Sequence, residues 1–535
     1  MGWKEDIQKR RTFAIISHPD AGKTTLTEKF LLYGGAVQLA GSVTARKNQR
    51  QTTSDWMELE RKRGISISST VLQFDYNGYR INLLDTPGHQ DFSEDTYRVL
   101  TAVDGVIMVI DAGKGIEAQT KKLFEVCRRR HIPIFTFLNK CDRPTLDPLA
   151  LIDEVEEVLG ISAVAMNWPL GTGEEFRGVY ERQTQLAHFY ERTAGGAYRA
   201  PLTITSLHDE EIARLLSPAT HARLVEEIAM LDVAGASYNP DEVLNGRMTP
   251  IYFGSAKNNF GVQLLLDNYL AYAAPPLPRV SGERFVMPDE EVFSGFIFKI
   301  QANMDPRHRD RIAFLRICSG KFTRDMSAIH ARTGKRVRLA NSQKTLGQSR
   351  ETIDEACAGD IVGFIGQSDF RIGDTLTEDP SIAYDEIPRF PSEHFVFLHN
   401  PSPSNYKKFR DGLDQLAQEG VVQVLYRVGT GTRVPILAAV GPLQFDVVQY
   451  RLEAEYGAPS RLEPTEWKFL RWLPAETSDG QLKALIIPSG SALVEDEHGQ
   501  VAVVFPGEWA LNYFMDKNDG VALHALPAKQ SALAL

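Results

Sequence analysis

Cysteine is scarce in this chain, and long apolar runs are missing from it. Four cysteines occur among 535 residues, and none of them belongs to a CxxC pair. Widely spaced cysteines in a large chain are typical of reduced thiols and argue against a disulfide scaffold or a zinc site. We expect Cys127, Cys141, Cys318 and Cys357 to be small buried residues.

The same scarcity of apolar runs argues against a membrane protein. The longest aliphatic stretch, Val106 to Ile110, is far too short to span a bilayer. The first ten residues lack the apolar segment of a signal peptide. We therefore expect a cytoplasmic protein that does not associate with membranes. The net charge of −10 argues against non-specific coating of nucleic acid, although a local basic patch could still contact RNA.

What the chain does have is length and an ordinary globular composition. With 43% hydrophobic and 24% charged residues, it can bury sizeable cores. A chain of this length is expected to form about three or four domains. Composition by itself leaves the function open.

A phosphate-binding loop is predicted near the N-terminus. Thr12 to Ser17 reads as a buried strand, Lys23 to Leu32 reads as a helix, and SHPDAGK spans their junction. Backbone N–H groups of such a loop and the N-terminus of its helix bind di- and triphosphates. The expected nucleotide contacts are Ser17, His18, Pro19, Asp20, Ala21, Gly22, Lys23, Thr24 and Thr25.

Two residues of this loop have specific expected roles. Lys23 is expected to reach the β- and γ-phosphates, and the hydroxyl of Thr24 is expected to bind Mg²⁺. The loop departs from the usual pattern because Ser17 replaces the first glycine, and serine tolerates fewer backbone conformations.

A hairpin and a second loop follow. Two apolar runs, Ile67 to Tyr76 and Tyr79 to Leu84, flank Asn77-Gly78, which is a strong signal for a type I′ turn. The second run leads into Asp85-Thr86-Pro87-Gly88-His89. An aspartate at a strand end beside a phosphate loop can hold Mg²⁺ or its water, so Asp85 is a candidate ligand. Gly88 can bring a backbone N–H close to a γ-phosphate. Without the phosphate loop, these residues would read as a simple turn.

The next elements predict a doubly wound α/β sheet. Gly105 to Asp111 and Ile132 to Leu138 read as buried parallel strands, with a helix over Glu117 to Arg130 between them. Ligands of such sheets bind at the carboxyl ends of the strands.

Asn139-Lys140-Cys141-Asp142 follows the second of these strands. The carboxylate of Asp142 can accept both donors of the Watson–Crick edge of guanine, a pair that adenine lacks. Asn139 would hold the loop, and the stem of Lys140 would lie along the base. Rejection of a base that leaves buried polar groups unpaired can reach roughly 10⁴-fold.

A fourth element, Gly254-Ser255-Ala256-Lys257, follows the apolar run Ile251 to Phe253. Small residues here let a backbone N–H approach the guanine oxygen, so Ser255, Ala256 and Lys257 are candidate base contacts. The tetrapeptide alone carries no information, but four elements in this order at strand ends argue against coincidence.

These motifs resemble the GTPase domain of the translational GTPases. Residues 139–142 match the family's NKxD motif, and residues 85–89 match its DxPGH motif. The resemblance implies that His89 is catalytic and positions the attacking water when the ribosome pushes it inward; the alternative is an ordinary surface or cap histidine. Residues 60–67 resemble the first switch, in which Ser66 would supply a hydroxyl to Mg²⁺. The polar run 41–54 is expected to order with the γ-phosphate.

The rest of the chain predicts further domains. The GTP-binding domain is assigned to residues 1–278, with an inserted subdomain at about 168–245. Short alternating strands predict a β-barrel domain over 290–388, and a mixed pattern predicts a C-terminal α+β domain over 391–535. A basic set in the barrel region could contact ribosomal RNA or simply be solvated: Arg307, Arg309, Arg311, Lys321, Arg324, Arg332, Lys335, Arg336 and Arg338.

Longer segments narrow the resemblance. ISHPDAGKTTLTEKFLL, DTPGHQDFSEDTYRVLTAVD, KIQANMDPRHRDRIAFLRICSGKF and VGPLQFDVVQYRLEAEYG are similar to the release factor 3 family, the class II peptide chain release factors of bacteria. The likeness runs from Arg11 to about Tyr456. It implies a monomeric, Mg²⁺-dependent GTPase that the ribosome stimulates to hydrolyse GTP to GDP and phosphate. Its task would be to promote dissociation and recycling of class I release factors during translation termination. The chain contains no Gly-Gly-Gln, so cleavage of peptidyl-tRNA is not expected.

Three alternatives remain open at this stage. The first is another translational GTPase that acts in elongation or ribosome rescue. The second is a metabolic P-loop kinase or ligase, against which Asp142 and His89 argue. The third is a module that binds GTP without hydrolysing it, for which His89 is the discriminating residue.

Overall fold

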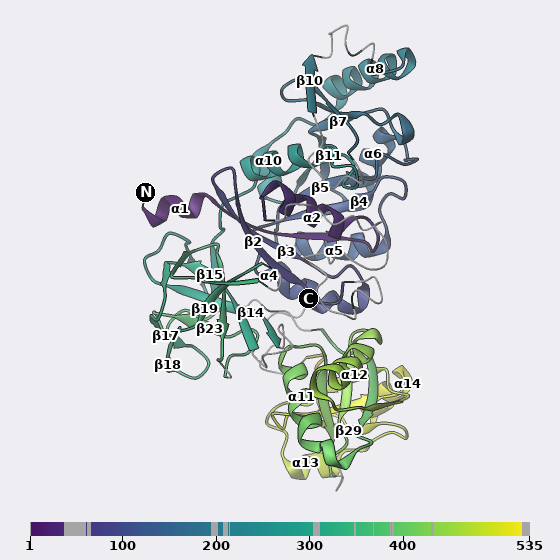
Figure 1. The fold of residues 1–535 in the computed structure, drawn as a ribbon. Coiled ribbons are helices and arrows are strands. Elements are labelled where there is room, and N and C mark those ends of the chain that lie inside the picture. Colours follow the sequence, from purple (N-terminus) through teal and green to yellow (C-terminus); the bar gives the residue numbers. More distant parts are fainter. Residues whose placement is uncertain are drawn as a thin grey trace.

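The computed structural model describes residues 2–36, 60, 66–193, 202–206, 212, 215–302, 311–346, 349–367, 369–385, 387, 390–429 and 433–526. Figure 1 shows an N-terminal α/β domain, a β-rich domain beside it and a C-terminal domain of mixed helices and strands. The predicted fold class is therefore confirmed. The whole polar run 41–54 and the first-switch stretch 61–65 lie outside the described residues.

The N-terminal domain is built on a mostly parallel sheet with the strand order β2-β3-β1-β4-β5-β11-β6. In this order the strands are β2 (Thr70–Tyr76), β3 (Tyr79–Asp85), β1 (Arg10–Ser17), β4 (Gly105–Asp111), β5 (Ile134–Asn139), β11 (Met248–Phe253) and β6 (Ser162–Ala165). Strand β2 runs antiparallel to β3, whereas the other neighbours are parallel. Parallel strands need crossover connections, and helices provide them here.

Helices cover both faces of this sheet. They are α2 (Lys23–Tyr33), α4 (Ser93–Thr101), α5 (Ala118–Arg129), α6 (Pro148–Leu159) and α10 (Val262–Tyr272). Successive residues of β1 point to opposite cores: Ala14 packs in one cluster with Leu123 of α5, and Phe13 packs in the other with Leu265 of α10. Burial on both sides explains why the central strands are almost entirely apolar in sequence.

The hairpin β2–β3 shows where the predicted boundaries were right and where they were wrong. Its turn residues Asn77 and Gly78 have φ values of 48° and 79°, as a type I′ turn requires. The predicted strand from Ile67, however, begins only at Thr70. The backbone N–H groups of residues 67–69 instead donate to the carboxylates of Glu60 and Asp95.

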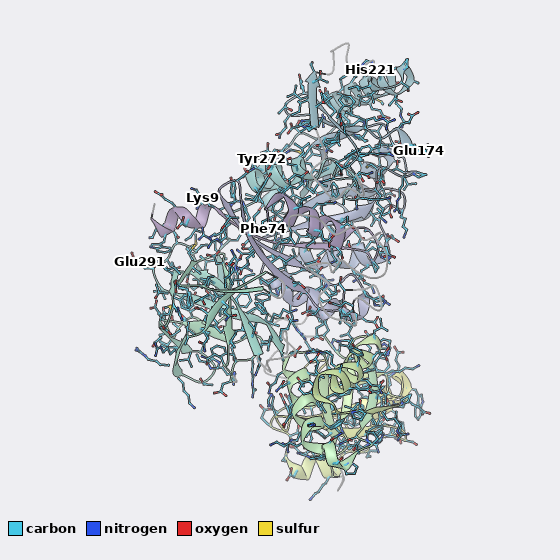
Figure 2. All side chains as sticks on the ribbon, viewed as in Figure 1. Lys9, Phe74, Glu174, His221, Tyr272 and Glu291 are labelled. Atoms are coloured by element: carbon cyan, nitrogen blue, oxygen red, sulfur yellow. The ribbon has the colours of Figure 1, made fainter. Side chains whose placement is uncertain are left out.

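Between β6 and β11 the chain forms a small additional unit whose apolar residues join one of the two cores of the main sheet. It contains a four-stranded sheet of β7 (Asn167–Leu170), β8 (Gly178–Glu181), β9 (Leu186–Tyr190) and β10 (Leu202–Ser206), with helices α8 (Pro218–Ala234) and α9 (Pro240–Leu244). This unit lies at the end of the molecule farthest from the C-terminal domain, where His221 is labelled in Figure 2.

The second domain is a small barrel of short strands. Its longer strands are β14 (Ser294–Ala302), β15 (Arg311–Ser319), β22 (Ile361–Ile365) and β19 (Ser342–Leu346), and the others are β16 (Lys321–Thr323), β17 (Ser327–His330), β18 (Lys335–Arg338), β20 (Ser349–Thr352), β21 (Glu355–Cys357) and β23 (Thr375–Thr377). Gly320 makes the predicted turn with φ 71°, and a Cβ there would lie 2.6 Å from the backbone of Val292. Any larger residue at this turn would be strained.

The C-terminal domain has a seven-stranded antiparallel sheet with helices packed on it. Its strands are β24 (His394–His399), β25 (Gln423–Arg427), β26 (Ile436–Ala439), β27 (Arg461–Pro464), β28 (Phe469–Trp472), β29 (Ala492–Asp496) and β30 (Val501–Phe505). Its main helices are α11 (Tyr406–Gln418), α12 (Leu443–Tyr456) and α14 (Glu508–Lys517). Among the described residues, no helix has both the length and the apolar character needed to cross a bilayer.

Candidate functional site

The four predicted loops meet at the carboxyl edge of the N-terminal sheet. Ile15 pairs with Asp85, Asp111 with Asn139, and Phe253 with Leu138 in the parallel ladders. Strands in parallel register end on the same side, so the loops that follow them lie side by side. Residues that are more than 200 positions apart in the sequence thus form one site.

The phosphate-binding loop leads from β1 into the N-terminus of α2. Gly22 has φ 104°, and a Cβ there would lie 2.2 Å from Nδ2 of Asn139. Only glycine fits this position. Lys23 and Thr24 are the first two residues of α2, and Thr25 follows them, so the unpaired N–H groups of the helix start face this loop.

Ser17, the departure from the usual motif, has a structural explanation. It is the last residue of β1 and pairs with Val109 of β4. Extended backbone accepts a Cβ without strain, so this position does not need the conformational freedom of glycine. The loop is closed by a hydrogen bond from the N–H of Ala21 to the carbonyl of His18 at 3.3 Å.

Lys23 and Asp85 form a buried ion pair. The Nζ of Lys23 lies 2.5 Å from Oδ1 of Asp85, and both side chains are at most 6% exposed. A buried charge without a partner is costly, so each of these groups compensates the other. The contact places the end of β3 directly against the phosphate loop.

Asn139 ties three loops together. Its Nδ2 donates to the carbonyl of Ala21 at 2.8 Å, and its Oδ1 accepts the N–H of Ala256 at 2.9 Å. The buried amide thus fixes the phosphate loop relative to the loop after β11. This is the loop-holding role that the sequence predicts for Asn139.

Asp142 and Ser255 are also brought together. The hydroxyl of Ser255 donates to Oδ1 of Asp142 at 2.7 Å and accepts the N–H of Asn258 at 3.2 Å. One hydroxyl thereby orients the carboxylate and leaves it further lone pairs for a ligand. Lys257, in the same loop, is exposed.

Lys140 is held by residues on both sides. Its Nζ donates to Oδ2 of Asp111 at 2.7 Å and to the carbonyl of Asp20 at 2.5 Å. The extended side chain therefore bridges the end of β4 and the phosphate loop. Between Lys140 and Asp142, burial raises the pKa of the Cys141 thiol to about 12, so this cysteine stays a neutral packing residue.

The second loop brings Gly88 next to the phosphate loop. A Cβ on Gly88 would lie 3.5 Å from Cα of Pro19. His89 caps the short helix η1 (Gln90–Phe92): its Nδ1 is 3.3 Å from the N–H of Asp91 and 3.2 Å from the carboxylate of the same residue. About a third of the His89 side chain is exposed.

The predicted Mg²⁺ ligands are two hydroxyls and one carboxylate, from Thr24, Ser66 and Asp85. Oxygen donors of this kind suit Mg²⁺, and the buried carboxylate of Asp85 lies beside the phosphate loop. Ser66 lies just before β2, next to the undescribed stretch 61–65. Its metal role stays a prediction. In the described part of the chain, no three or more His, Cys, Asp and Glu side chains gather into a metal-binding group.

Three functional partners were missed by sequence reasoning. Asp111 holds Lys140, Glu117 lies 3.3 Å from Nε2 of His18, and Asp91 holds His89. Asp111 could have been found, because it ends β4 at the same sheet edge. The other two depend on how loops fold back, for which the sequence carries no signal.

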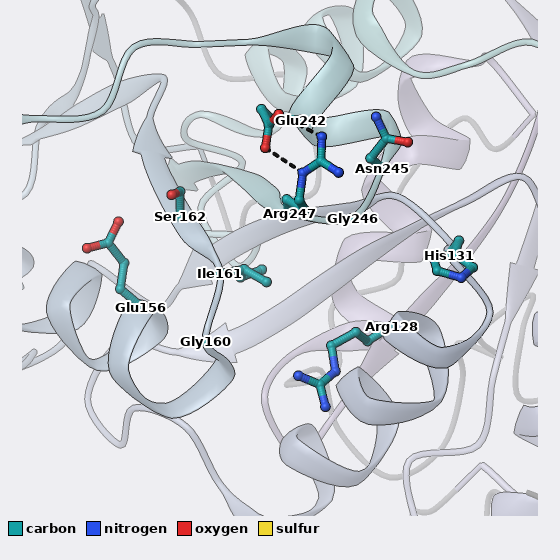
Figure 3. Close-up of a pocket in the computed structure, with 10 residues that line it drawn as sticks. All are labelled: Arg128, His131, Glu156, Gly160, Ile161, Ser162, Glu242, Asn245, Gly246 and Arg247. Atoms are coloured by element: carbon teal, nitrogen blue, oxygen red, sulfur yellow. Dashed lines mark hydrogen bonds and ion pairs between the residues drawn. The ribbon is translucent and has the colours of Figure 1, made fainter.

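A hollow lies at the opposite, amino edge of the sheet. Its volume is about 830 Å³, and its lining residues come from the starts of β6 and β11 and from neighbouring helix ends (Figure 3). Arg247 and Glu242 form an exposed ion pair at its rim. None of the predicted site residues lines this hollow.

Family models match three successive parts of the chain. Residues 8–275 match the elongation factor Tu GTP binding domain, residues 292–379 match domain 2 of elongation factor G, and residues 384–515 match the class II release factor RF3 C-terminal domain.

Curated relatives extend this match to nearly the whole chain. Peptide chain release factor 3 of Gloeobacter violaceus is 54% identical over 97% of this chain and 98% of its own length. That of Synechocystis sp. is 52% identical over 99% of this chain and 96% of its own length. A crystal structure from Thermus thermophilus is similar in fold, with a TM-score of 0.69 over 88% of this chain and 71% of that chain at 22% identity. The chain therefore belongs to the peptide chain release factor 3 family and is a GTPase of translation termination.

Proposed function

We propose that this GTPase acts as a monomer on the terminating ribosome, in the cytoplasm, where it promotes the dissociation and recycling of class I release factors. The observation that supports this most is the conjunction of a guanine-reading carboxylate, Asp142, with a switch histidine, His89, at one sheet edge. Asp142 would select GTP among nucleotides, and His89 would be the residue on which the ribosome acts to stimulate hydrolysis.

The phosphate end of GTP would bind at the start of α2. The N–H groups at the start of this helix, which have no partner within the helix, would donate to the phosphates. Lys23 would exchange Asp85 for phosphate oxygens, which keeps its buried charge compensated. Mg²⁺, held by Thr24, Ser66 and Asp85, would supply positive charge to the phosphate oxygens. The ion pair therefore holds both charged side chains beside the loop where the phosphates and Mg²⁺ would bind.

The base end of GTP would bind between the loops after β5 and β11. Asp142, oriented by Ser255, would accept the two guanine donors. The N–H of Ala256 lies next to Asn139, where it can approach the guanine oxygen. The Nζ of Lys140 donates to the carbonyl of Asp20 in the phosphate loop, so the aliphatic part of this side chain can cover the base. Lys257 would border the base from the exposed side.

Hydrolysis would depend on the position of His89. In the structure the ring is held by residue 91 rather than by the phosphate loop. A histidine that must turn to orient water makes hydrolysis conditional on an external partner. The ribosome, through its RNA and proteins, would be that partner, and exposed cations of the barrel strand β18 offer one surface for RNA.

The test is GTP hydrolysis by the full chain with and without ribosomes, together with release of a labelled class I factor from termination complexes. Strong stimulation of hydrolysis by ribosomes, and faster release of the class I factor with GTP than with GDP or no nucleotide, support the proposal. Stimulation without any effect on the class I factor would instead indicate a role in elongation or ribosome rescue. Hydrolysis that is indifferent to ribosomes would contradict the proposal.

A further inference from the structure

Asp91 connects His89 with the C-terminal domain. It lies in η1 and is 5% exposed. Both its backbone N–H and its carboxylate oxygen Oδ1 lie within hydrogen-bonding distance of Nδ1 of His89. With Nδ1 protonated, the ring donates to the carboxylate; with Nδ1 unprotonated, it accepts the N–H. Residue 91 holds the ring in either form. The second carboxylate oxygen, Oδ2, accepts the N–H of Leu443 at 2.9 Å, from a residue 352 positions later in the chain.

The contact at Leu443 is made by the start of a helix. Leu443 is the first residue of α12, where backbone N–H groups have no partner inside the helix. A carboxylate is favoured at this positive helix end. Asp91 therefore serves as a cap for a helix of another domain, while its own domain uses it to hold His89.

The absence of a side chain at Gly441 allows the C-terminal domain to approach Asp91 closely. A Cβ built on Gly441 would lie 2.4 Å from both Cβ and Cγ of Asp91 and 2.5 Å from its Cα. Atoms this close would overlap. One of them is the backbone Cα of Asp91, which a change of side-chain rotamer cannot move. The C-terminal domain can dock on η1 in this way only because residue 441 has no side chain.

Neighbouring contacts extend the same interface. Arg98 of α4 donates to the carbonyl of Gly420 at 3.1 Å. Ile67 and Phe92 form a buried cluster with Val447 of α12. The C-terminal domain thus covers the residue next to Ser66 as well as the segment that follows His89.

The barrel completes the junction. Lys299 of β14 donates to the hydroxyl of Ser68 at 2.7 Å and to the carbonyl of Ser69 at 2.6 Å, and the N–H of Ala302 donates to Glu419 of the C-terminal domain at 3.1 Å. The enclosed space left at this junction is about 50 Å³, which is too small for any nucleotide. The junction is therefore an interface between domains and not a second ligand site.

We infer that Asp91 is a positioning residue through which the C-terminal domain restrains His89. While Gly441 and Leu443 fix Asp91, the imidazole stays on η1. When the C-terminal domain moves off η1, Asp91 is released, and His89 is free to turn to the nucleotide. A partner that displaces this domain would thereby switch on hydrolysis. The inference rests on the proposed role of His89 and adds the device that controls it.

Two variants break the contact from its two sides. Gly441→Ala inserts a methyl group against Asp91, and Asp91→Ala removes the carboxylate. Gly507→Ala is the matched control, because a Cβ there meets nothing within 4 Å and its φ of −172° suits any residue. The readout is ribosome-free GTP hydrolysis by the full chain. Both variants should raise kcat about tenfold, the effect of losing one charge-assisted hydrogen bond, with KM changed less than about twofold.

Combining the variants tests whether the two changes act on one contact. The double variant should be no faster than either single one, because both remove the same restraint. Adding His89→Ala should abolish the rise, which a general loosening of the structure would not predict. Hydrogen exchange of the peptide that contains Leu443 should become faster in both single variants but not in Gly507→Ala.

The outcomes separate this inference from the proposed function. If Gly441→Ala or Asp91→Ala folds but leaves the ribosome-free rate unchanged, the restraint does not exist, although the termination role can still stand. A rise that persists without His89, or one that is additive in the double variant, also overturns the inference. If His89→Ala alone leaves ribosome-stimulated hydrolysis intact, the proposed role of His89 fails, and this inference fails with it.

Discussion

The two edges of the N-terminal sheet differ in what they offer a ligand. The carboxyl edge gathers polar groups from four loops, and Lys23, Asp85 and Asn139 there are almost completely buried. The amino edge has a hollow of about 830 Å³, but its ion pair between Arg247 and Glu242 is exposed to solvent. One edge is built from convergent buried groups, and the other is an open depression.

A hollow of this volume does not by itself indicate a functional site. Buried polar groups are costly unless they are paired, so a chain keeps them together only where the structure compensates them. Exposed ion pairs cost little and stabilise little, and they occur over the whole surface of ordinary proteins.

The largest effect is expected for His89→Ala. Ribosome-stimulated kcat should fall about a thousandfold, because the residue that would position the attacking water is lost, while GTP affinity stays near that of the unchanged protein. Single-turnover hydrolysis with saturating ribosomes measures this. His221→Ala, in the inserted unit at the far end of the molecule, is the control and should leave the rate unchanged. Equal loss in both variants would remove His89 from the mechanism.

Lys23→Ala comes next in size. Affinity for GTP and GDP should fall roughly several hundredfold, because a buried charge-assisted phosphate contact disappears. The variant also leaves the buried carboxylate of Asp85 without its 2.5 Å partner, so thermal unfolding should occur at a lower temperature. Calorimetric titration gives the affinity, with Lys122→Ala on the exposed face of α5 as control. Retention of full phosphate affinity would contradict the assigned site.

Asp142→Asn should change base preference more than it changes affinity. The asparagine oxygen can still accept the hydroxyl of Ser255, so the loop should keep its shape. The new amide opposes the guanine donors and suits xanthine, so the ratio of GTP to XTP affinity should fall about a hundredfold. Competition binding with the two nucleotides measures this ratio. Asp153→Asn on the exposed face of α6 should leave it unchanged, and an unaltered ratio in Asp142→Asn would show that another group reads the base.

The parts of the fold that could be predicted from the sequence are those with local signals. Apolar runs of strand length indicated the sheet, Asn77-Gly78 indicated the hairpin, and the motifs placed their residues because parallel strands end at one edge. Errors of a few residues arose where side chains took over backbone pairing. The start of β2 at Thr70, where carboxylates hold the preceding N–H groups, is one example.

Contacts between distant segments could not be predicted in the same way. The bond from Leu443 to Asp91 joins two domains, and neither residue carries a motif that points to the other. Gly441 reads in sequence as an ordinary turn residue, and only the docked structure shows that Asp91 occupies the space of its missing side chain. Such pairs are set by how whole domains pack, which no window of sequence contains.

The smallest effect is expected at the other edge, for Arg247→Ala. The guanidinium of Arg247 is well exposed and is bonded to the carboxylate of Glu242, so its loss should change nucleotide affinity and ribosome-stimulated hydrolysis by less than about twofold. The hydrolysis and titration assays used for His89 and Lys23 apply without change, and Arg128→Ala, across the hollow in Figure 3, provides a second variant. If either substitution reduced GTP turnover as strongly as Lys23→Ala, the open depression would be part of the active machinery. Convergent buried polar groups would then fail to mark the active site of this protein.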